Sequence, residues 1–378
     1  YLNDFNSDRK SSIFQMLSYC IDHHYNDTYK MIIDMIENCP KMYYKQLDQC
    51  MKSCVSRGYF DSIPLLLNEG ATTNVLLNLF CRKNNEIGID YMLEFSYIDV
   101  NAPYKDKSPL EACISNKNAN SAVSLLRNDF INMQVIDGKL EKGKTLIHLA
   151  CELGLAKVVS YLLRKHLYDV NLPTQDGVCP IHFACKSGDY DTVVAVIRTK
   201  EVRVRTKVKE GEYKKRSALH FACCSGNPKI VSLLLDSDER FNVDDVDGED
   251  KTPLIYAIKG NFVDCVFVLL EQEKIDINQE YQGNNLLQIA CLENLDEVFD
   301  VLLNSIVFDP NQPCNDERVI LVVAIENQNV HIVKSILNKF GHSVDVNIDT
   351  NDGKTPLIIA CELGEIDIVK LLLDHDSI

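Results

Sequence analysis

The chain has 378 residues, of which 46% are hydrophobic and 25% are charged, so its composition is globular and not disordered or collagen-like. A formal charge of −16 at pH 7 makes it a poor general binder of nucleic acid or anionic membrane. The fifteen cysteines include no CxxC pair and no zinc-type spacing, which favours reduced thiols in a cytosolic or nuclear protein. The longest apolar runs are too short to span a bilayer.

The first quarter of the chain predicts helices without a regular repeat. Residues 11–24 and 28–37 each read as a helix, and we interpret residues 1–48 as an N-terminal helical segment or cap. Residues 49–98 predict further helix pairs, one around Cys54 and a weaker one around Phe80. The interval between these two residues is too short for a long connection, so we expect degenerate pairs with reduced loops.

From residue 99 onward a six-residue string recurs, of which Thr-Pro-Leu-Ile-Ile-Ala at 355–360 is one copy. Its last residue, here called the anchor, returns at intervals of 33 to 38 residues. The anchors are Cys113, Ala150, Ala184, Ala222, Ala257, Ala290, Ala324 and Ala360. Eight copies near one period predict a stack of similar supersecondary units instead of two or three globular domains.

Each unit predicts two helices and a turn. Thr or Ser opens the string as a helix cap, and Pro at the first helical position loses no hydrogen bond. A glycine four residues after the anchor ends the first helix where a positive φ is required, at Gly154, Gly188, Gly226 and Gly364. A second, branched-apolar helix follows, and then a polar Asp-Val-Asn-like turn such as 169–171.

This pattern resembles the ankyrin repeat family in its Thr-Pro-Leu-His-x-Ala string, its glycine, its Val-Leu-Leu run and its Asp-Val-Asn turn. The resemblance implies an all-α solenoid of stacked helix pairs with short β-hairpin fingers, where a finger is the segment that leads from one pair to the next. It gives eight repeats over 99–378 and degenerate ankyrin-like pairs over 49–98. Because no polar terminal unit closes the C-terminal end, we expect further repeats or another domain to follow. The abundance of Asn, Ile, Asp and Lys favours a protist-type genome.

Two sets of chemically capable side chains occupy fixed repeat positions. His148, His182 and His220 could suggest a row of metal ligands, but stacked units lie about 10 Å apart, too far for shared ligation. The resemblance implies that this histidine is structural. The cysteines that follow the anchors predict small core residues without a catalytic base. They are Cys151, Cys185, Cys223, Cys291 and Cys361. We expect no cofactor and no metal.

One enzyme motif matches by sequence. Residues 138–145 fit the phosphate loop G-x-x-x-x-G-K-T, with Gly138 first and Lys144 and Thr145 last, and residues 131–137 could form the preceding strand. The alternative is the turn and cap of a repeat, because Gly353 begins the same Gly-Lys-Thr string before the last anchor. The alternative is favoured because no second strand with a magnesium-binding Asp can be placed. Nucleotide binding is kept as a remote alternative.

The most distinctive local feature is a basic segment over 198–216, with nine bases and three acids, so its charge is +6 and the rest of the chain carries −22. Alternating valines and bases predict a long β-hairpin. We call seven of its side chains the basic finger: Arg203, Arg205, Lys207, Lys209, Lys214, Lys215 and Arg216. They could grip an acidic partner, or they could pair with the acidic segment 244–250 of the next finger.

The family resemblance implies a non-enzymatic scaffold or adaptor that binds a partner protein on a concave face of fingers and first helices. The residues expected on that face are Glu152, Lys186, Lys259, Glu326 and Glu362. The partner is expected to be another protein, with an acidic segment as one option, and neither a small-molecule substrate nor nucleic acid. A cytoplasmic location is expected, with a cytoskeletal link as one role. The alternative is a regulatory segment of a larger channel or enzyme.

Overall fold

The computed structural model describes residues 73–94, 98–104, 107–138, 140–237, 241–306, 308–350 and 352–375. The predicted segment 1–48 and the helix pair around Cys54 lie outside these residues.

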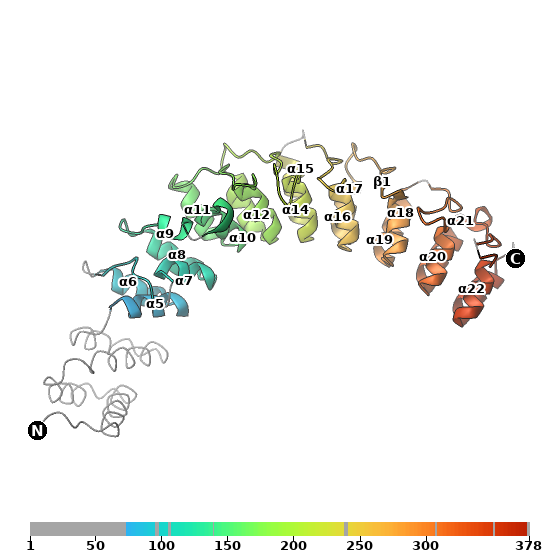
Figure 1. The fold of residues 1–378 in the computed structure, drawn as a ribbon, viewed down its shortest axis with the longest axis horizontal. Coiled ribbons are helices and arrows are strands. Elements are labelled where there is room, and N and C mark those ends of the chain that lie inside the picture. Colours follow the sequence, from blue (N-terminus) through green and yellow to red (C-terminus); the bar gives the residue numbers. More distant parts are fainter. Residues whose placement is uncertain are drawn as a thin grey trace, which may run out of the picture. The chain divides into compact units, whose positions relative to one another are not determined.

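Helices follow one another in pairs along the described chain (Figure 1), which confirms the all-α class. The pairs are α5 (Thr73–Lys83) and α6 (Glu86–Leu93), α7 (Pro109–Ser115) and α8 (Ala119–Leu126), α10 (Leu146–Glu152) and α11 (Ala156–Arg164), α12 (Pro180–Ser187) and α13 (Tyr190–Ile197), α14 (Ala218–Ser225) and α15 (Pro228–Ser237), α16 (Pro253–Lys259) and α17 (Val263–Leu270), α18 (Leu286–Leu292) and α19 (Asp296–Ser305), α20 (Ile320–Glu326) and α21 (Val330–Phe340), and α22 (Pro356–Leu363) and α23 (Ile366–Leu373). Shorter elements are α9 (Gln134–Asp137), η2 (Glu141–Gly143), η3 (Gly341–Ser343), β1 (Glu280–Tyr281) and β2 (Asn284–Asn285).

The chain divides into two compact units. The first contains the described residues up to Leu146 and the segment Leu155–Leu167, and the second contains Ile147–Gly154 and everything from Tyr168 onward. In the first unit α5 packs on α7, and α8 packs on α6 and α11. In the second unit the first helices stack in the order α12, α14, α16, α18, α20 and α22, while the second helices stack from α13 to α23.

The ends of the helices confirm the repeat chemistry. The Thr252 hydroxyl accepts the Ile255 N–H at the start of α16, and Asn285 caps α18 in the same way. Proline occupies a first-turn position in α7, α12, α16 and α22. The predicted glycines after the anchors have φ between +72° and +76°, the left-handed geometry in which glycine ends a helix without steric cost.

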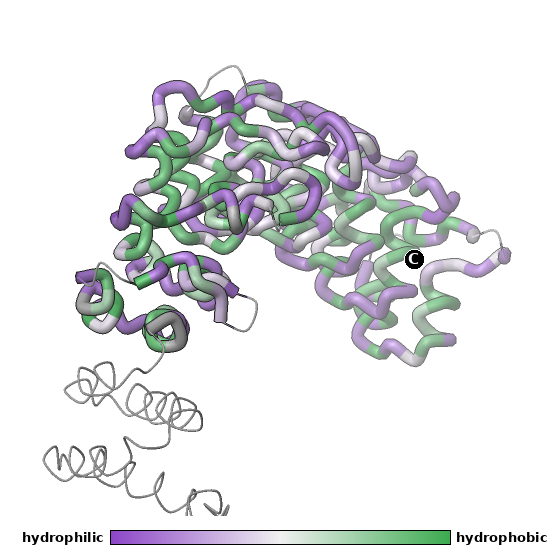
Figure 2. The backbone as a smooth tube through the Cα atoms, turned by 60° about the vertical axis from the view of Figure 1, so that its left-hand side comes forward, coloured by the Kyte–Doolittle hydropathy of each residue, from purple (hydrophilic) through white to green (hydrophobic). Residues whose placement is uncertain are grey.

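The hydrophobic core of each repeat lies between its two helices. All eight anchors are fully buried, from Cys113 to Ala360, so the small side chain that recurs there allows the helices to approach closely. The branched residues of the second helices, such as Val158 and Leu162 of α11, are buried as well. Figure 2 shows hydrophobic residues along the helices, whereas the connecting segments are mostly hydrophilic.

The fingers are tied to one another by asparagine side chains. The Asn171 N–H donates to the Asp169 carboxylate at 2.9 Å, which closes a tight turn. The Asn171 amide then donates to the Glu201 carbonyl at 2.8 Å and accepts the Arg203 N–H at 2.7 Å. Asn311 makes the same two contacts with the finger that follows it. The Asp-x-Asn turn therefore sets the spacing of successive fingers.

The long hairpin predicted for 198–216 is only partly formed. Val208 exchanges backbone hydrogen bonds with the carbonyl of Arg216 and the N–H of Lys215, and Lys207 pairs with Ser217, but the segment holds no regular strand. The predicted alternation of sides holds, because Val204 and Val208 are buried while the basic residues between them are exposed. The strand prediction was wrong because the backbone groups upstream of Lys207 have other partners.

Candidate functional site

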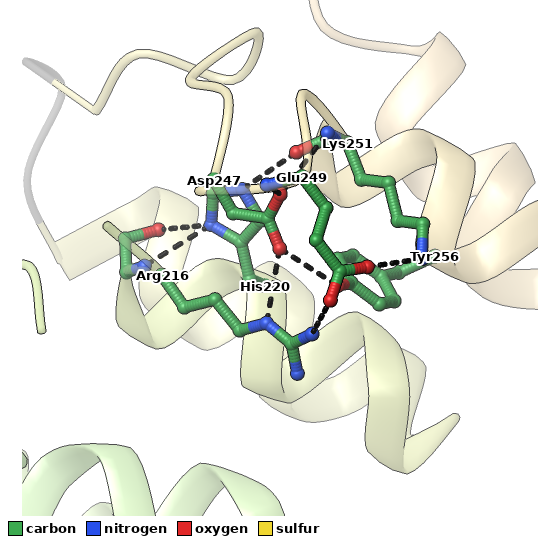
Figure 3. Close-up of polar contacts among 7 residues, drawn as sticks. Arg216, His220, Asp247, Glu249, Lys251 and Tyr256 are labelled. Atoms are coloured by element: carbon green, nitrogen blue, oxygen red, sulfur yellow. Dashed lines mark hydrogen bonds and ion pairs between the residues drawn. The ribbon is translucent and has the colours of Figure 1, made fainter. Parts of the chain in front are cut away.

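A buried ion pair joins the basic finger to the acidic finger that follows it. The Arg216 guanidinium donates from Nε to Asp247 Oδ2 at 3.0 Å, and the side chain of Asp247 is 1% exposed (Figure 3). The Tyr256 hydroxyl donates to the same oxygen at 2.7 Å, and the N–H groups of Glu249 and Lys251 donate to the other oxygen. Every acceptor position of the carboxylate is thus used within the protein.

This hydrogen bonding sets the charge of the ion pair. Burial alone would raise the pKa of Asp247, but the hydrogen bonds from Tyr256, the two backbone N–H groups and Arg216 lower it below its ordinary value. Burial and the hydrogen bond to Asp247 together raise the pKa of the Tyr256 hydroxyl. Asp247 and Arg216 therefore stay ionised, and Tyr256 stays a donor, at physiological pH.

Aromatic rings and cations alternate beside this ion pair. Arg216 lies between two tyrosine rings, with its guanidinium carbon 5.2 Å from the centre of Tyr213 and 4.7 Å from that of Tyr256. Lys186, Lys251, Lys259 and Tyr281 extend the series in both directions at 5.0 to 5.8 Å. We call these seven residues the tyrosine–cation ladder: Lys186, Tyr213, Arg216, Tyr256, Lys251, Tyr281 and Lys259. Such contacts contribute about 0.5–2 kcal/mol each and fix long side chains in place.

The seven residues of the basic finger have different surroundings. Lys207 forms a salt bridge of 2.8 Å with Asp245, and Arg216 forms the pair with Asp247 described above. Arg205 is exposed. The other four, Arg203, Lys209, Lys214 and Lys215, are also exposed, and none forms a salt bridge with a described residue. The sequence left open whether the finger pairs internally; in the structure, two of its side chains do.

The backbone of the basic finger is held on both sides. The N–H groups of Lys209 and Glu210 donate to the Asp176 carbonyl of the preceding finger. The Gly248 N–H of the following finger donates to the Lys214 carbonyl at 2.8 Å. The exposed lysines are therefore presented by a fixed loop and not by a free one.

The five residues predicted on the first helices lie on α10, α12, α16, α20 and α22, so they line a surface and do not form one cluster. Lys186 donates to the Tyr213 hydroxyl at 3.0 Å, which raises its pKa, and Lys259 pairs with Glu293 at 3.0 Å. Glu326 and Glu362 each receive a cation from the preceding finger. Glu152 is half-buried on α10. We call this surface of fingers and first helices in the second unit the finger face.

A groove of about 470 Å³ opens on the finger face between α20 and α22 and the fingers that precede them. Its lining includes six carboxylates and two cations, a formal charge of −4: Asp316, Glu317, Glu326, Asp349, Asp352, Glu362, Arg318 and Lys354. We call it the acidic groove. Hydrogen bonding to Arg318 lowers the pKa of Asp316, and the contact with Glu362 raises that of Lys354. Sequence reasoning placed two of the carboxylates on this face but missed the groove.

The repeated histidines join helices to fingers. In His182, Nδ1 accepts the Cys179 N–H at 2.9 Å and Nε2 lies 2.7 Å from the Thr206 carbonyl. Burial lowers the pKa of His182 to about 4, so the ring is neutral. Among the described residues, no three His, Cys, Asp or Glu side chains are grouped to hold a metal ion. No helix in the described ranges has the length and apolar character of a membrane span.

The phosphate-loop match lies in a different local structure from the one the motif requires. The possible strand at 131–137 was wrong, because the short helix α9 occupies Gln134–Asp137 and Gly138 ends it. The Asp137 carboxylate accepts the N–H of Leu146, the first residue of α10, at 2.6 Å. A carboxylate therefore occupies the helix N-terminus at which a phosphate would have to bind.

The comparison with family profiles agrees with this architecture. The family profile for ankyrin repeats, in sets of three copies, matches residues 131–208, 199–281, 219–314 and 286–378, which together cover more than half of the chain. An ankyrin repeat protein of Acanthamoeba polyphaga mimivirus is 28% identical over 47% of this chain and 22% of its own length. The human transient receptor potential cation channel subfamily A member 1 is 26% identical over 52% of this chain and 18% of its own. The chain thus spans about a fifth of these relatives. The crystal structure of the human ASB11 ankyrin repeat domain has a TM-score of 0.49 at 21% identity, covering 62% of this chain and 98% of that one.

Proposed function

This chain belongs to the ankyrin repeat family, and we propose that it is a non-enzymatic scaffold that holds an acidic segment of a partner protein on its basic finger. Ankyrin repeats are in general protein–protein interaction modules. The proposal rests on the observation that only some of the side chains of the basic finger pair within the protein. After Lys207 and Arg216 have paired with the acidic finger, Arg203, Lys209, Lys214 and Lys215 remain exposed, without a salt bridge to any described residue.

The surroundings of these cations suit protein recognition. Tyr213 lies next to Lys214 in the chain and is held by Lys186 and Arg216, so a large amphipathic side chain is fixed beside the charged ones. Tyrosine and arginine are enriched among the few residues that supply most of the binding energy of protein interfaces. Fixed cations also accelerate encounter with an acidic surface.

The test is a charge reversal with a matched control. Lys214→Glu with Lys215→Glu should weaken binding of the partner recovered by crosslinking from native extract by about tenfold or more, and it should flatten the salt dependence of binding. The control is Lys229→Glu with Lys334→Glu, two exposed residues on the second helices α15 and α21, which changes the net charge equally. Equal affinity of both double variants would overturn the proposal.

The relatives suggest a second function for these repeats, as part of a larger protein. Because the chain spans about a fifth of the cation channel that it resembles, we propose as the alternative that it is the regulatory repeat segment of a larger protein. A cytoplasmic location, with attachment to the cytoskeleton, belongs to the scaffold proposal. Fractionation of cell extracts with an antibody against this chain separates the two, because a segment of a membrane channel would sediment with membranes.

A further inference from the structure

We propose that the acidic groove is a second docking site, which receives an extended, lysine- or arginine-rich segment of a partner protein. The groove lies on the finger face between α20 and α22, whereas the basic finger precedes α14, so this inference does not depend on the function proposed for the basic finger.

The shape of the groove suits a long side chain. Its lining includes the buried apolar residues Val319, Val322 and Ile359, and Leu363, which is 40% exposed. The stems of lysine and arginine are apolar and lie along such surfaces while their charged ends stay near water or carboxylates. A volume of about 470 Å³ is sufficient for side chains of this kind.

Two of the protein's own cations line the groove and pair with its carboxylates. Arg318 reaches from one finger to Glu326 at the end of α20, and Lys354 reaches from the next finger to Glu362 near the end of α22 at 2.6 Å. Both pairs join a finger cation to a first-helix carboxylate eight residues later. The carboxylates of the groove therefore already form ion pairs with cationic side chains of this chain.

The carboxylates are not all satisfied by these two cations. Asp316 and Glu326 share Arg318, and Glu362 holds Lys354. Asp349 and Asp352 are exposed and form no salt bridge with a described residue. They belong to the lining of the groove and leave it with a surplus of negative charge, which favours a cationic occupant over an acidic or neutral one.

A defined peptide tests the site. The probe is a short extended peptide of alternating lysine and leucine, labelled for fluorescence anisotropy, with a glutamate-for-lysine peptide as the negative probe. We expect Asp349→Asn with Asp352→Asn to weaken binding of the lysine peptide by about tenfold, or about 1.4 kcal/mol. The matched control is Asp191→Asn with Asp264→Asn, two exposed residues on α13 and α17, which should change affinity less than about twofold.

Two further measurements separate local docking from general attraction. Leu363→Ser leaves the charge unchanged and should also weaken binding, because it removes apolar surface at the side of the groove. Lys214→Glu with Lys215→Glu should leave peptide affinity intact, so failure of the function proposed for the basic finger would not affect this result. Equal losses in the groove and control variants, or sedimentation showing that another copy of the chain fills the groove, would overturn the inference.

Discussion

The Arg216 guanidinium lies 3.0 Å from the Asp247 carboxylate and between the rings of Tyr213 and Tyr256. This ion pair joins the basic finger to the acidic finger. Some of the opposite charges of these two segments therefore pair with each other inside the protein. Arg216 and Lys207 hold the basic finger against the acidic one, whereas Lys209, Lys214 and Lys215 are exposed and are the lysines that the proposed function assigns to partner binding.

Replacing Arg216 should destabilise the second unit. Arg216→Ala leaves the Asp247 carboxylate, 1% exposed, without its cation, so we expect the free energy of unfolding to fall by about 2–3 kcal/mol. Arg216→Lys keeps the charge but not the planar group between the two rings, so its loss should be smaller. Urea unfolding followed by circular dichroism measures both changes. Lys215→Ala is the control, and an equal effect of Arg216→Ala and Lys215→Ala would contradict the structural role.

The buried histidines should make the fold sensitive to mild acid. Burial lowers the pKa of both His182 and His220 to about 4, whereas an unfolded histidine has a pKa of about 6.5. Above a pH of about 6.5, each histidine is neutral in both the folded and the unfolded chain, so its contribution to the free energy of unfolding is complete. As the pH falls from about 6.5 towards 4, the unfolded chain takes up protons that the folded rings do not, so stability decreases, by up to about 3 kcal/mol per histidine.

A natural substitution within the chain supplies the test of that pH dependence. Gln288 occupies the histidine position of its own repeat, accepts the Asn285 N–H at 2.9 Å and donates to the Pro313 carbonyl at 3.0 Å. His182→Gln should therefore keep both hydrogen bonds at pH 8 and flatten the loss of stability between pH 6.5 and 4. His331→Gln, on the exposed surface of α21, is the control. An unchanged slope in His182→Gln would sink the explanation.

The features that sequence predicted best are those that each repeat determines locally. The anchors, the glycines with positive φ and the histidine position follow from one helix pair and its turn, and a period near 35 repeats them. The prediction of a long hairpin was wrong because the backbone groups of this segment form hydrogen bonds elsewhere in the fold. The Thr206 carbonyl accepts from His182, and the Arg203 N–H donates to Asn171, so neither is free to extend a ladder.

The geometry of the finger face depends on contacts between repeats, which the period does not encode. Charge alone suggested that the two fingers could pair, but not that Arg216 would select Asp247 and Lys207 would select Asp245. The tyrosine–cation ladder left no distinctive signal in the sequence, because an aromatic residue directly before the anchor occurs at Phe183 and Phe221 as well as at Tyr256. The acidic groove combines residues from two fingers and two helices, so no linear motif reports it.

The phosphate-loop match should not bind nucleotide. The Asp137 carboxylate accepts the Leu146 N–H at the start of α10, so a phosphate there would meet a negative charge. Isothermal titration with Mg²⁺ and ATP should give no saturable heat, and Lys144→Ala should behave as the unmodified chain does. Saturable binding that Lys144→Ala abolishes would show that residues 138–145 are a true nucleotide site.

Two glycines with the same backbone but different neighbours should respond differently to alanine. Gly226 and Gly364 have φ of +72° and +76°, so the left-handed strain of alanine is about 1–2 kcal/mol at each. A Cβ on Gly226 would lie 2.4 Å from the Phe262 ring, whereas one on Gly364 would meet no described atom within 4 Å. Gly226→Ala should therefore lower the free energy of unfolding by about 1–3 kcal/mol more than Gly364→Ala.

The ring contact can be isolated from the strain by a double-mutant cycle. Phe262→Leu removes the ring that a Cβ on Gly226 would strike, so some of the extra destabilisation of Gly226→Ala should disappear in the double variant. Phe262→Leu combined with Gly364→Ala should be additive, because the two residues share no contact in the described structure. If Gly226→Ala and Gly364→Ala were equally destabilising, the Phe262 ring would have to move aside at no cost, and glycine would be required at both positions by φ alone.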